Sequence, residues 1–511
     1  MSEIVLTTLN AKYIHSAFGL RYLMANLGDL KSRASIVEFD INQRPIDIAE
    51  ALLARNPKII GFGVYIWNVT ETTEVVTTIK RVRPEIVVIL GGPEVSYETE
   101  EQVIVKNADY VITGEADLTF AEVCRKLLNH QLPESKIISA SLPTFDQLTL
   151  PYDLYTKEDI AHRILYVEAS RGCPFTCEFC LSSLDIPVRQ ASLPTFIEYL
   201  KELLDRGAKH LKFVDRTFNL NLNSSKAILE FLLQRHEPGM FFHFEMVPDR
   251  LPEGLRQVIA KFPSGALQFE VGIQTFNKQV GELIRRRQNY DKLEENFRFL
   301  HQHTGVHIHA DLIVGLPGES LESFAAGFDR LIALKPQEIQ VGILKRLRGT
   351  PIIRHDQEWK MVYNPAPPYE VLQTKLITFS EMQRMRRFAR YWDLVGNSGN
   401  FVEATPLLWS KSSSPFEAFL QWTDWLYAQI RRTDSIALVR LIELLFRFLQ
   451  EERGLDPKQI ANCLWRDFQR GGRKEKPIFL RDYLEEEPIE RSAPPTMALP
   501  KRQARHLAQR V

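Results

Sequence analysis

Short apolar runs alternate with amphipathic stretches over the first 128 residues. The runs have the length of buried strands, and the stretches between them repeat apolar residues at the helical period. Strands separated by helices predict a parallel, doubly wound sheet that binds ligands beyond the carboxyl ends of its strands. The expected strands are Ile4–Leu6, Ile36–Phe39, Ile59–Val64, Ile86–Leu90 and Tyr110–Ile112, and the expected helices are Phe18–Leu27, Ile46–Ala54, Glu71–Val82 and Leu118–Leu128.

A second alternating series begins at Ile164, after a segment whose prolines and polar residues predict a linker over residues 131–160. Six β/α units over residues 161–350 predict a complete or partial barrel, with its chemistry at the C-terminal rim of the strands. The expected strands are Leu165–Ala169, His210–Val214, Phe241–Glu245, Leu267–Gly272, His307–Val314 and Ile339–Leu344, and the helices between them include Pro194–Arg206, Ser224–Gln234 and Tyr290–Gln302.

After about Thr350 the pattern becomes that of long amphipathic helices. The expected helices are Tyr369–Leu394, Pro415–Arg432 and Thr433–Glu452, in a helical domain over residues 351–487. Residues 488–511 are rich in Pro, Arg and Gln, which predicts a flexible tail. Its basic stretch Lys501–His506 is expected to be solvated, with a contact to phosphate or nucleic acid as the alternative.

Composition narrows the class of protein. Of the 511 residues, 44% are hydrophobic and 25% are charged, and the formal net charge is zero. No global field therefore recruits nucleic acid or an anionic membrane. Neither a signal-peptide pattern nor an apolar run of about 18–20 residues occurs. Five cysteines do not make a disulfide framework, but three of them lie within eight positions, which predicts a metal site in a reducing cytoplasm.

The cysteine triplet follows the first expected barrel strand. Cys173, Cys177 and Cys180 have the spacing C-x3-C-x2-C, and Gly172 and Pro174 allow a tight loop around them. Three thiolates bind three irons of a cubane and leave the fourth iron open for a substrate or cofactor. The alternative is a structural zinc site, which usually needs four protein ligands. No further cysteine lies nearby to supply a fourth.

Residues 160–350 therefore resemble the radical S-adenosylmethionine (SAM) superfamily. The resemblance implies a [4Fe-4S] cluster on the three cysteines, SAM chelated to the open iron, and an external electron donor of the flavodoxin or ferredoxin type. The reduced cluster would cleave SAM to a 5′-deoxyadenosyl radical, while the protein supplies orientation and shelter. Phe179, before the last cysteine, would pack near the adenine.

Further residues resemble SAM contacts of that superfamily. Glu245 ends the third barrel strand, Glu270 and Gln274 belong to the fourth, and Asp311 precedes a Gly-Leu-Pro-Gly-Glu element that contains Leu316 and Pro317. Asp215, after the second strand, would face SAM or the substrate. The alternative for each polar residue is a structural hydrogen bond at the barrel rim.

The N-terminal region resembles the cobalamin-binding domain that precedes many radical SAM proteins. The matching stretches are Ile60–Asn68, Gly91–Glu94 and Gly114–Asp117, in which glycines let the backbone approach a bulky ligand. The implied cobalamin contacts are Asn10, Tyr13, His15, Tyr65, Trp67, Asn68, Gly91, Gly92, Pro93, Glu94, Gly114 and Glu115.

One departure concerns the lower cobalt ligand. Cobalamin proteins that replace this ligand carry D-x-H-x-x-G, whereas here Tyr13 takes the place of the Asp and the glycine comes one residue late. The role of His15 as a cobalt ligand therefore stays open. The alternative for the whole region is a flavodoxin-like domain whose pocket is empty or binds another ligand.

The expected fold is thus α/β: a flavodoxin-like, cobalamin-binding sheet over residues 1–130, a partial (β/α)6 radical SAM barrel, and a mostly helical C-terminal region that resembles an uncharacterised extension in a subset of these proteins. The resemblance implies a cobalamin-dependent methyltransferase acting on an unactivated carbon or phosphorus centre. Radical SAM chemistry without methylation is one alternative, and a non-catalytic cobalamin- or redox-sensing protein is another. The sequence does not identify the substrate, small or macromolecular.

Overall fold

A parallel six-stranded sheet confirms the doubly wound pattern near the N-terminus. Its strand order is β2-β1-β3-β4-β5-β6, and every neighbouring pair is parallel. This computed structural model describes residues 2–185, 187–484 and 499–507. The strands are β1 (Ile4–Asn10), β2 (Ala34–Asp40), β3 (Ile59–Gly63), β4 (Val87–Gly91), β5 (Tyr110–Thr113) and β6 (Ile137–Ser139).

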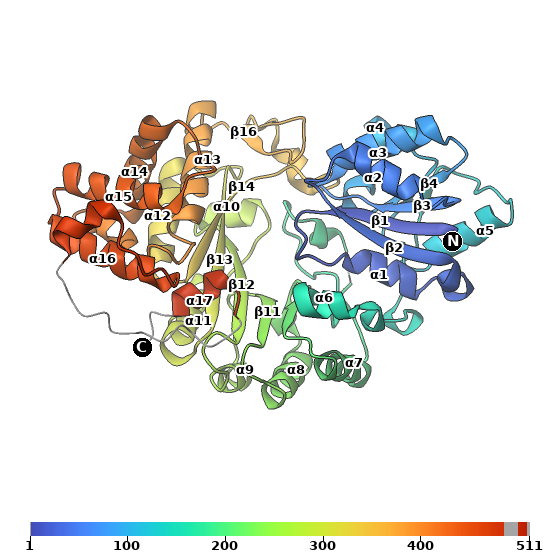
Figure 1. Cartoon of the computed structure of the whole chain (residues 1–511), viewed down its shortest axis with the longest axis horizontal. Helices are drawn as coiled ribbons and strands as arrows, with labels where there is room; N and C mark the ends of the chain where they lie inside the picture. Colours follow the sequence, from blue (N-terminus) through green and yellow to red (C-terminus); the bar gives the residue numbers. More distant parts are fainter. Residues whose placement is uncertain (1, 186, 485–498, 508–511) are drawn as a thin grey trace. The chain divides into compact units, whose positions relative to one another are not determined.

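Helices cover both faces of this sheet (Figure 1). Alternate residues of a strand point to opposite faces, so Val5 of β1 joins one apolar cluster and Leu6 joins the other. One face carries α1 (Phe18–Ala25) and α5 (Thr119–Leu128), and the other carries α2 (Pro45–Leu53), α3 (Val69–Val82) and α4 (Val103–Asn107).

The segment expected as a linker contains regular structure. Strand β6 pairs in parallel with β5 and completes the sheet, and helix α6 (Lys157–His162) begins at a capping box formed by Thr156 and Asp159. With only two apolar residues, Ile137 and Ile138, β6 does not form an apolar run that indicates a strand, so the sequence pattern missed it.

All six strands expected over residues 161–350 are confirmed, and they form the second sheet. They are β7 (Leu165–Val167), β10 (His210–Phe213), β11 (Phe241–Met246), β12 (Leu267–Gln274), β13 (His307–Val314) and β14 (Glu338–Ile343). The accompanying helices are α7 (Leu193–Asp205), α8 (Leu222–Gln234), α9 (Glu253–Ile259), α10 (Lys278–Leu283), α11 (Tyr290–His303) and α12 (Leu321–Ala333). A short antiparallel pair, β8 (Ser170–Arg171) with β9 (Arg189–Gln190), brackets the cysteine loop.

Two compact units divide the chain by their contacts. The first runs to Arg216 and includes Lys345–Ile353 and Asn364–Glu370, and the second contains the remaining residues. The first sheet, β7 to β10 and the cysteine loop therefore belong to the first unit. Strands β11 to β14 and the C-terminal helices belong to the second.

The C-terminal region is mostly helical, as expected. It contains β15 (Val362–Tyr363), β16 (Val371–Gln373), α13 (Phe379–Leu394), α14 (Pro415–Ile430), α15 (Leu438–Glu451), α16 (Pro457–Arg470) and α17 (Lys501–Leu507). The helix expected from Tyr369 is wrong at its start. It begins at Phe379, where Thr378 and Glu381 form a capping box that ends the preceding extended segment.

The expected solvated tail is wrong for Lys501–Leu507, which form α17. Arg502 bonds to Glu338 and Asp393, at 2.9 Å each, and the buried His506 ring packs edge-on against His307. The Glu338 side chain is 2% exposed, so its carboxylate needs such partners. Residues 488–498 and 508–511 of the expected tail lie outside the described residues. In the described ranges, no helix is long and apolar enough to span a membrane.

Candidate functional site

The cysteine loop is held in a defined conformation between β8 and β9. The backbone N–H of Cys173 donates to the carbonyl oxygen of Asp185 at 3.1 Å, and that of Cys180 donates to Cys177 at 3.2 Å. Gly172 has φ +91°, and a Cβ there would lie 2.8 Å from the Asp185 oxygen. Only glycine therefore fits at the entry to this loop.

The three cysteines share one loop and are largely buried. Cys173 and Cys177 are buried and Cys180 is half-buried. Among the residues that the structure describes, no group of three or more His, Cys, Asp or Glu is arranged to hold one metal ion. In a cubane each thiolate binds a different iron, so the sulfurs need not converge on one point.

Asp215 supports the base of this loop. Its carboxylate accepts hydrogen bonds from the Ser170 hydroxyl at 2.6 Å and the Ala169 N–H at 3.0 Å. Burial raises the pKa of Asp215 to about 7, although these hydrogen bonds oppose the shift. The Asp215 side chain thus joins the end of β10 to Ala169 and Ser170, which lead into the cysteine loop.

In the second unit, strand pairing brings together several predicted SAM contacts. Glu245 of β11 lies opposite Glu270 of β12, and Asp311 of β13 lies opposite Gly272. The Glu270 carboxylate contacts His243 Nε2 at 2.9 Å. Neighbouring strands therefore carry a row of acidic and imidazole groups.

Asp311 is paired within its own strand. Its carboxylate lies 3.3 Å from His309 Nε2, and burial raises the pKa of Asp311. Burial lowers the pKa of His309, but hydrogen bonds to Asp311 and Glu338 outweigh burial and raise it to about 10. His309 is therefore charged at neutral pH and compensates the buried acids.

The remaining predicted SAM residues lie at strand ends. Gln274 ends β12 with φ +72°, where the pairing with β13 shifts by one residue. Leu316 and Pro317 are buried in the turn after β13. Glu319 fixes that turn, since it accepts hydrogen bonds from Thr275 Oγ1 at 2.6 Å and Ser323 Oγ at 3.2 Å. Phe179 is half-buried in the cysteine loop of the first unit.

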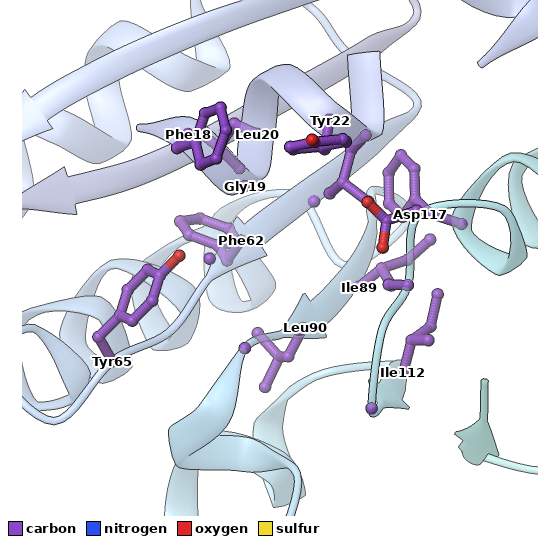
Figure 2. Close-up of a pocket in the computed structure, with 18 of the residues that line it drawn as sticks. Phe18, Gly19, Leu20, Tyr22, Phe62, Tyr65, Ile89, Leu90, Ile112 and Asp117 are labelled. Carbon is purple, nitrogen blue, oxygen red and sulfur yellow. The ribbon is translucent and has the colours of Figure 1, made fainter. Parts of the chain in front are cut away.

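A cavity of about 230 Å³ opens in the first unit, at the carboxyl ends of β3, β4 and β5 (Figure 2). Its apolar walls come from α1, the three strands and the start of α5. The lining residues are Phe18, Gly19, Leu20, Tyr22, Leu23, Gly61, Phe62, Gly63, Tyr65, Ile89, Leu90, Gly91, Gly92, Ile112, Gly114, Ala116, Asp117, Phe120, Glu168 and Arg171. A flat aromatic group fits such a space.

Four predicted cobalamin contacts line this cavity: Tyr65, Gly91, Gly92 and Gly114. Gly92 has φ +109°, and a Cβ there would lie 2.5 Å from the Val64 carbonyl oxygen. The glycine pair thus lets two loops approach closely at the mouth of the cavity. Pro93 begins the 3-10 turn Pro93–Val95 that follows.

Other predicted contacts have their polar groups bound within the protein. The buried Asn68 amide donates to Thr8, Leu9 and Gly63, and Asn10 donates to Glu38 at 2.7 Å. Glu94 accepts from the Tyr369 hydroxyl at 2.6 Å and from Arg348 at 2.9 Å. Glu115 is bound by Arg171 and Arg189. These side chains organise the loops around the cavity.

Two residues of the imperfect cobalt-ligand motif, Tyr13 and His15, lie outside the cavity lining, whereas its late glycine, Gly19, lines the cavity. His15 Nδ1 is 2.6 Å from the Tyr166 hydroxyl, and burial lowers the pKa of His15. Tyr13 is 51% exposed and donates to Glu158. Trp67, 46% exposed, stacks on Tyr65 with ring centroids 4.4 Å apart.

Sequence reasoning missed the α1 face and most of the charged wall of the cavity. Tyr22 and Glu168 line it, and no sequence pattern marks them as ligand contacts. Asp117 and Arg171 also line it, and each had a signal: Asp117 ends the stretch Gly114–Asp117, and Arg171 directly precedes the glycine and first cysteine of the triplet. In Figure 2, Tyr22 and Asp117 lie on the same side of the cavity.

Three family profiles match successive parts of the chain. A family profile described as a B12 binding domain matches residues 4–124, and one described as the radical SAM superfamily matches residues 167–331. A third, described as a protein of unknown function (DUF4080), matches residues 357–502.

Relatives are distant. An uncharacterized methyltransferase, PH0819, of Pyrococcus horikoshii is 25% identical over 55% of this chain and 65% of its own length. The 2-(S-pantetheinyl)-carbapenam-3-carboxylate methyltransferase of Streptantibioticus cattleyicolor is 23% identical over 58% of this chain and 48% of its own length. The chain thus spans less than two thirds of these curated relatives.

Among solved structures, the radical SAM methyltransferase TsrM of Kitasatospora setae, with tryptophan and a SAM analogue bound, superposes with a TM-score of 0.57. The likeness covers 72% of this chain and 80% of TsrM at 16% identity, which shows a shared fold. The chain therefore carries, in order, a B12-binding domain, a radical SAM domain and a DUF4080 domain.

Proposed function

We propose that this protein is a cobalamin-dependent radical SAM methyltransferase that acts on an unactivated carbon or phosphorus centre. One observation carries the proposal. A cavity at the carboxyl end of the first sheet and the cysteine loop belong to one unit, and Arg171 of the loop's flanking strand lines the cavity. The unit thus offers a corrinoid site beside a cluster site.

Cys173, Cys177 and Cys180 would hold the [4Fe-4S] cluster. Gly172 sets the loop entry, and the backbone of Asp185 fixes the first cysteine. When bound, the cluster would supply one-electron cleavage of SAM, and cobalamin would carry the methyl group. The protein's own part is to position these groups and keep water away.

The cavity fits the aromatic tail of a corrinoid. Its walls are mainly apolar, and Gly91 and Gly92 allow the ligand to approach the backbone. The Tyr65–Trp67 stack adjoins this site with one exposed face, which would pack against the corrin. His15 is already engaged with Tyr166, which favours binding without a histidine ligand to cobalt.

In the second unit, Glu245, Glu270, Gln274 and Asp311 are the proposed SAM-holding residues, with the Leu316–Pro317 turn beside the adenine. Strand pairing that aligns the carboxylates supports this assignment. Phe179, in the cysteine loop of the first unit, is a further proposed adenine contact. An external flavodoxin or ferredoxin would donate the electron. A reducing cytoplasm is the proposed location, because an open iron–sulfur cluster survives there.

The test is anaerobic reconstitution with iron, sulfide and hydroxocobalamin, followed by measurement of iron content, corrinoid content and 5′-deoxyadenosine. Cys177→Ala should abolish SAM cleavage and lower iron content while leaving the circular dichroism spectrum unchanged. Cys463→Ala is the matched control, since Cys463 lies on α16 apart from the triplet.

The outcomes separate the candidates. Deoxyadenosine without bound corrinoid would favour radical chemistry without cobalamin, and bound corrinoid without deoxyadenosine would favour a sensor. Native rates of SAM cleavage in the Cys177→Ala variant would overturn the cluster assignment.

A further inference from the structure

The loop Gly114–Asp117 contacts both the cavity and the arginines that flank the cysteine loop. Gly114, Ala116 and Asp117 line the cavity, while the carboxylates of Glu115 and Asp117 bind arginines that flank the cysteine loop. Arg171 Nη1 lies 3.0 Å from both Glu115 Oε2 and Asp117 Oδ2. One short loop therefore contacts the cavity and the cysteine-bearing segment.

Arg171 itself belongs to the cavity wall. Its side chain is 13% exposed, its guanidinium lies 4.3 Å from the centre of the Tyr22 ring, and its Nε donates to Glu168 at 2.8 Å. Tyr22 and Glu168 also line the cavity. A ligand in the cavity therefore meets the same charge cluster that precedes Gly172 and Cys173.

Arg189 connects the loop Gly114–Asp117 to the end of the cysteine loop. Its guanidinium bonds to Glu115, to both carboxylate oxygens of Asp185 at 2.9 and 3.0 Å, and to the Pro143 carbonyl at 2.8 Å. The Asp185 backbone carbonyl accepts the Cys173 N–H. A continuous path thus runs from Glu115 through Arg189 and Asp185 to the first cysteine.

This group of paired arginines and carboxylates resists partial rearrangement. Removing one partner of a buried ion pair leaves an uncompensated charge, so the arginines and carboxylates move together or not at all. Arginine also offers a rigid fork that lysine lacks. The geometry of loop Gly114–Asp117 is thereby tied to that of the cysteine loop.

We infer that Arg171 and Arg189 are positioning residues that couple corrinoid binding in the cavity to cluster binding in the cysteine loop. The inference rests on the proposed function. A corrinoid tail that packs against Asp117 and Arg171 orders the cysteine loop, and a bound cluster orders the cavity wall in return. Linkage requires the two effects on affinity to be equal.

The test compares hydroxocobalamin affinity in cluster-free and cluster-loaded full-length protein, by absorbance titration without oxygen. In the wild type the cluster should tighten binding by at least about fivefold, the lower range of allosteric coupling. Arg171→Lys and Arg189→Lys should each reduce that ratio toward one. Both variants keep the positive charge and lose the fork.

Arg21→Lys is the matched control. Arg21 is a buried arginine of the same unit, paired with Glu38 and Asp159, and it does not line the cavity. This variant should keep the wild-type ratio. If Arg171→Lys fails to fold, Arg189→Lys alone decides, because Arg189 does not line the cavity either.

A spectroscopic measurement distinguishes coupling between the corrinoid and cluster sites from a purely structural role of these arginines. With excess titanium(III) citrate, which keeps the cluster reduced and converts cobalamin to its diamagnetic cob(I) form, added cobalamin should change the electron paramagnetic resonance spectrum of the wild-type cluster and leave that of Arg189→Lys unchanged. Equal affinities with and without the cluster, in a wild type that binds both, would overturn the inference while the proposed function stands. Failure to bind cobalamin or cluster at all would overturn the proposed function itself.

Discussion

The surroundings of a glutamate determine its charge state and its role, as two glutamates in the glycine-rich loops show. Glu94 and Glu115 belong to loops that resemble cobalamin contacts, yet Arg348, Tyr369, Arg171 and Arg189 occupy their carboxylates. Burial raises the pKa of Glu115, but Arg189 and Arg171 outweigh burial and hold it below its ordinary value. Glu115 thus stays ionised and serves as an anchor.

Glu319 allows a pH-dependent prediction. Burial raises the pKa of Glu319 from its ordinary 4.5 to about 7, against the hydrogen bonds from Thr275 and Ser323. Between these two values the folded protein binds a proton that the unfolded chain releases, so the free energy of unfolding falls as pH rises through this window. Glu319→Gln keeps the acceptor oxygen and should remove this decline.

Urea unfolding at pH 5 and pH 7.5 measures the effect. The free energy of unfolding of Glu319→Gln, relative to that of the wild type, should be higher at pH 7.5 than at pH 5. Glu322→Gln is the control, because backbone and Ser320 hydrogen bonds lower the pKa of this exposed carboxyl from 4.5. Its titration therefore lies below the pH range compared, and its effect on stability should be nearly the same at pH 5 and pH 7.5. A difference between wild type and Glu319→Gln that is independent of pH would contradict the prediction.

Gly91 allows a prediction about the cavity. A Cβ there would meet no atom closer than the Ile112 carbonyl oxygen at 3.8 Å, so the fold tolerates a side chain. Gly91→Val should weaken cobalamin binding about tenfold or more, since overfilling a packed site costs about 1–3 kcal/mol. An absorbance titration measures the affinity. Gly254→Val, on α9 with no atom within 4 Å, should leave it unchanged.

At the scale of elements, length determines what the sequence pattern reveals. The long helices α13, α14 and α15 and the barrel strands have clear periods, whereas β6 and α17 are too short to show one. Short elements depend on tertiary partners: β6 pairs with β5, and α17 bonds through Arg502 to Glu338. Their stability therefore comes from packing.

Helix α17 yields a prediction about stability. Deleting residues 499–511 removes Arg502 and His506, and leaves Glu338 with its histidine partners alone. The free energy of unfolding should fall by about 1–3 kcal/mol, a usual range for losing buried contacts. Urea denaturation measures it. Deleting residues 508–511 alone keeps the helix and should have little effect, and equal stability of both deletions would refute the role assigned to α17.

At the scale of the whole molecule, the two units predict the thermal behaviour. Contacts cluster within each unit, so calorimetry should resolve two unfolding transitions. Cobalamin at about 100 times its Kd should stabilise the first unit by about 2.7 kcal/mol and leave the other transition in place. The Gly91→Val variant should lose this shift. A single transition in the wild type would show that the units unfold together.

The sequence by itself determined the order of the folds and predicts the place of the cluster. Strand and helix periods are local, so the doubly wound sheet and the six later strands are readable along the chain. The cysteine spacing is equally local and predicts Cys173, Cys177 and Cys180 as the cluster ligands before any fold is known.

Only the tertiary structure decided which side chains meet. Tyr22, Asp117 and the pair Glu168 and Arg171 come from three distant segments and line one cavity, and Arg189 reaches Glu115 across 74 positions of sequence. Pairings over such distances leave no periodic trace, because they depend on how strands and loops pack. The structure also shows that Glu94 and Glu115, which stay predicted ligand contacts, anchor their loops, and that Lys501–Leu507 of the expected tail form a helix.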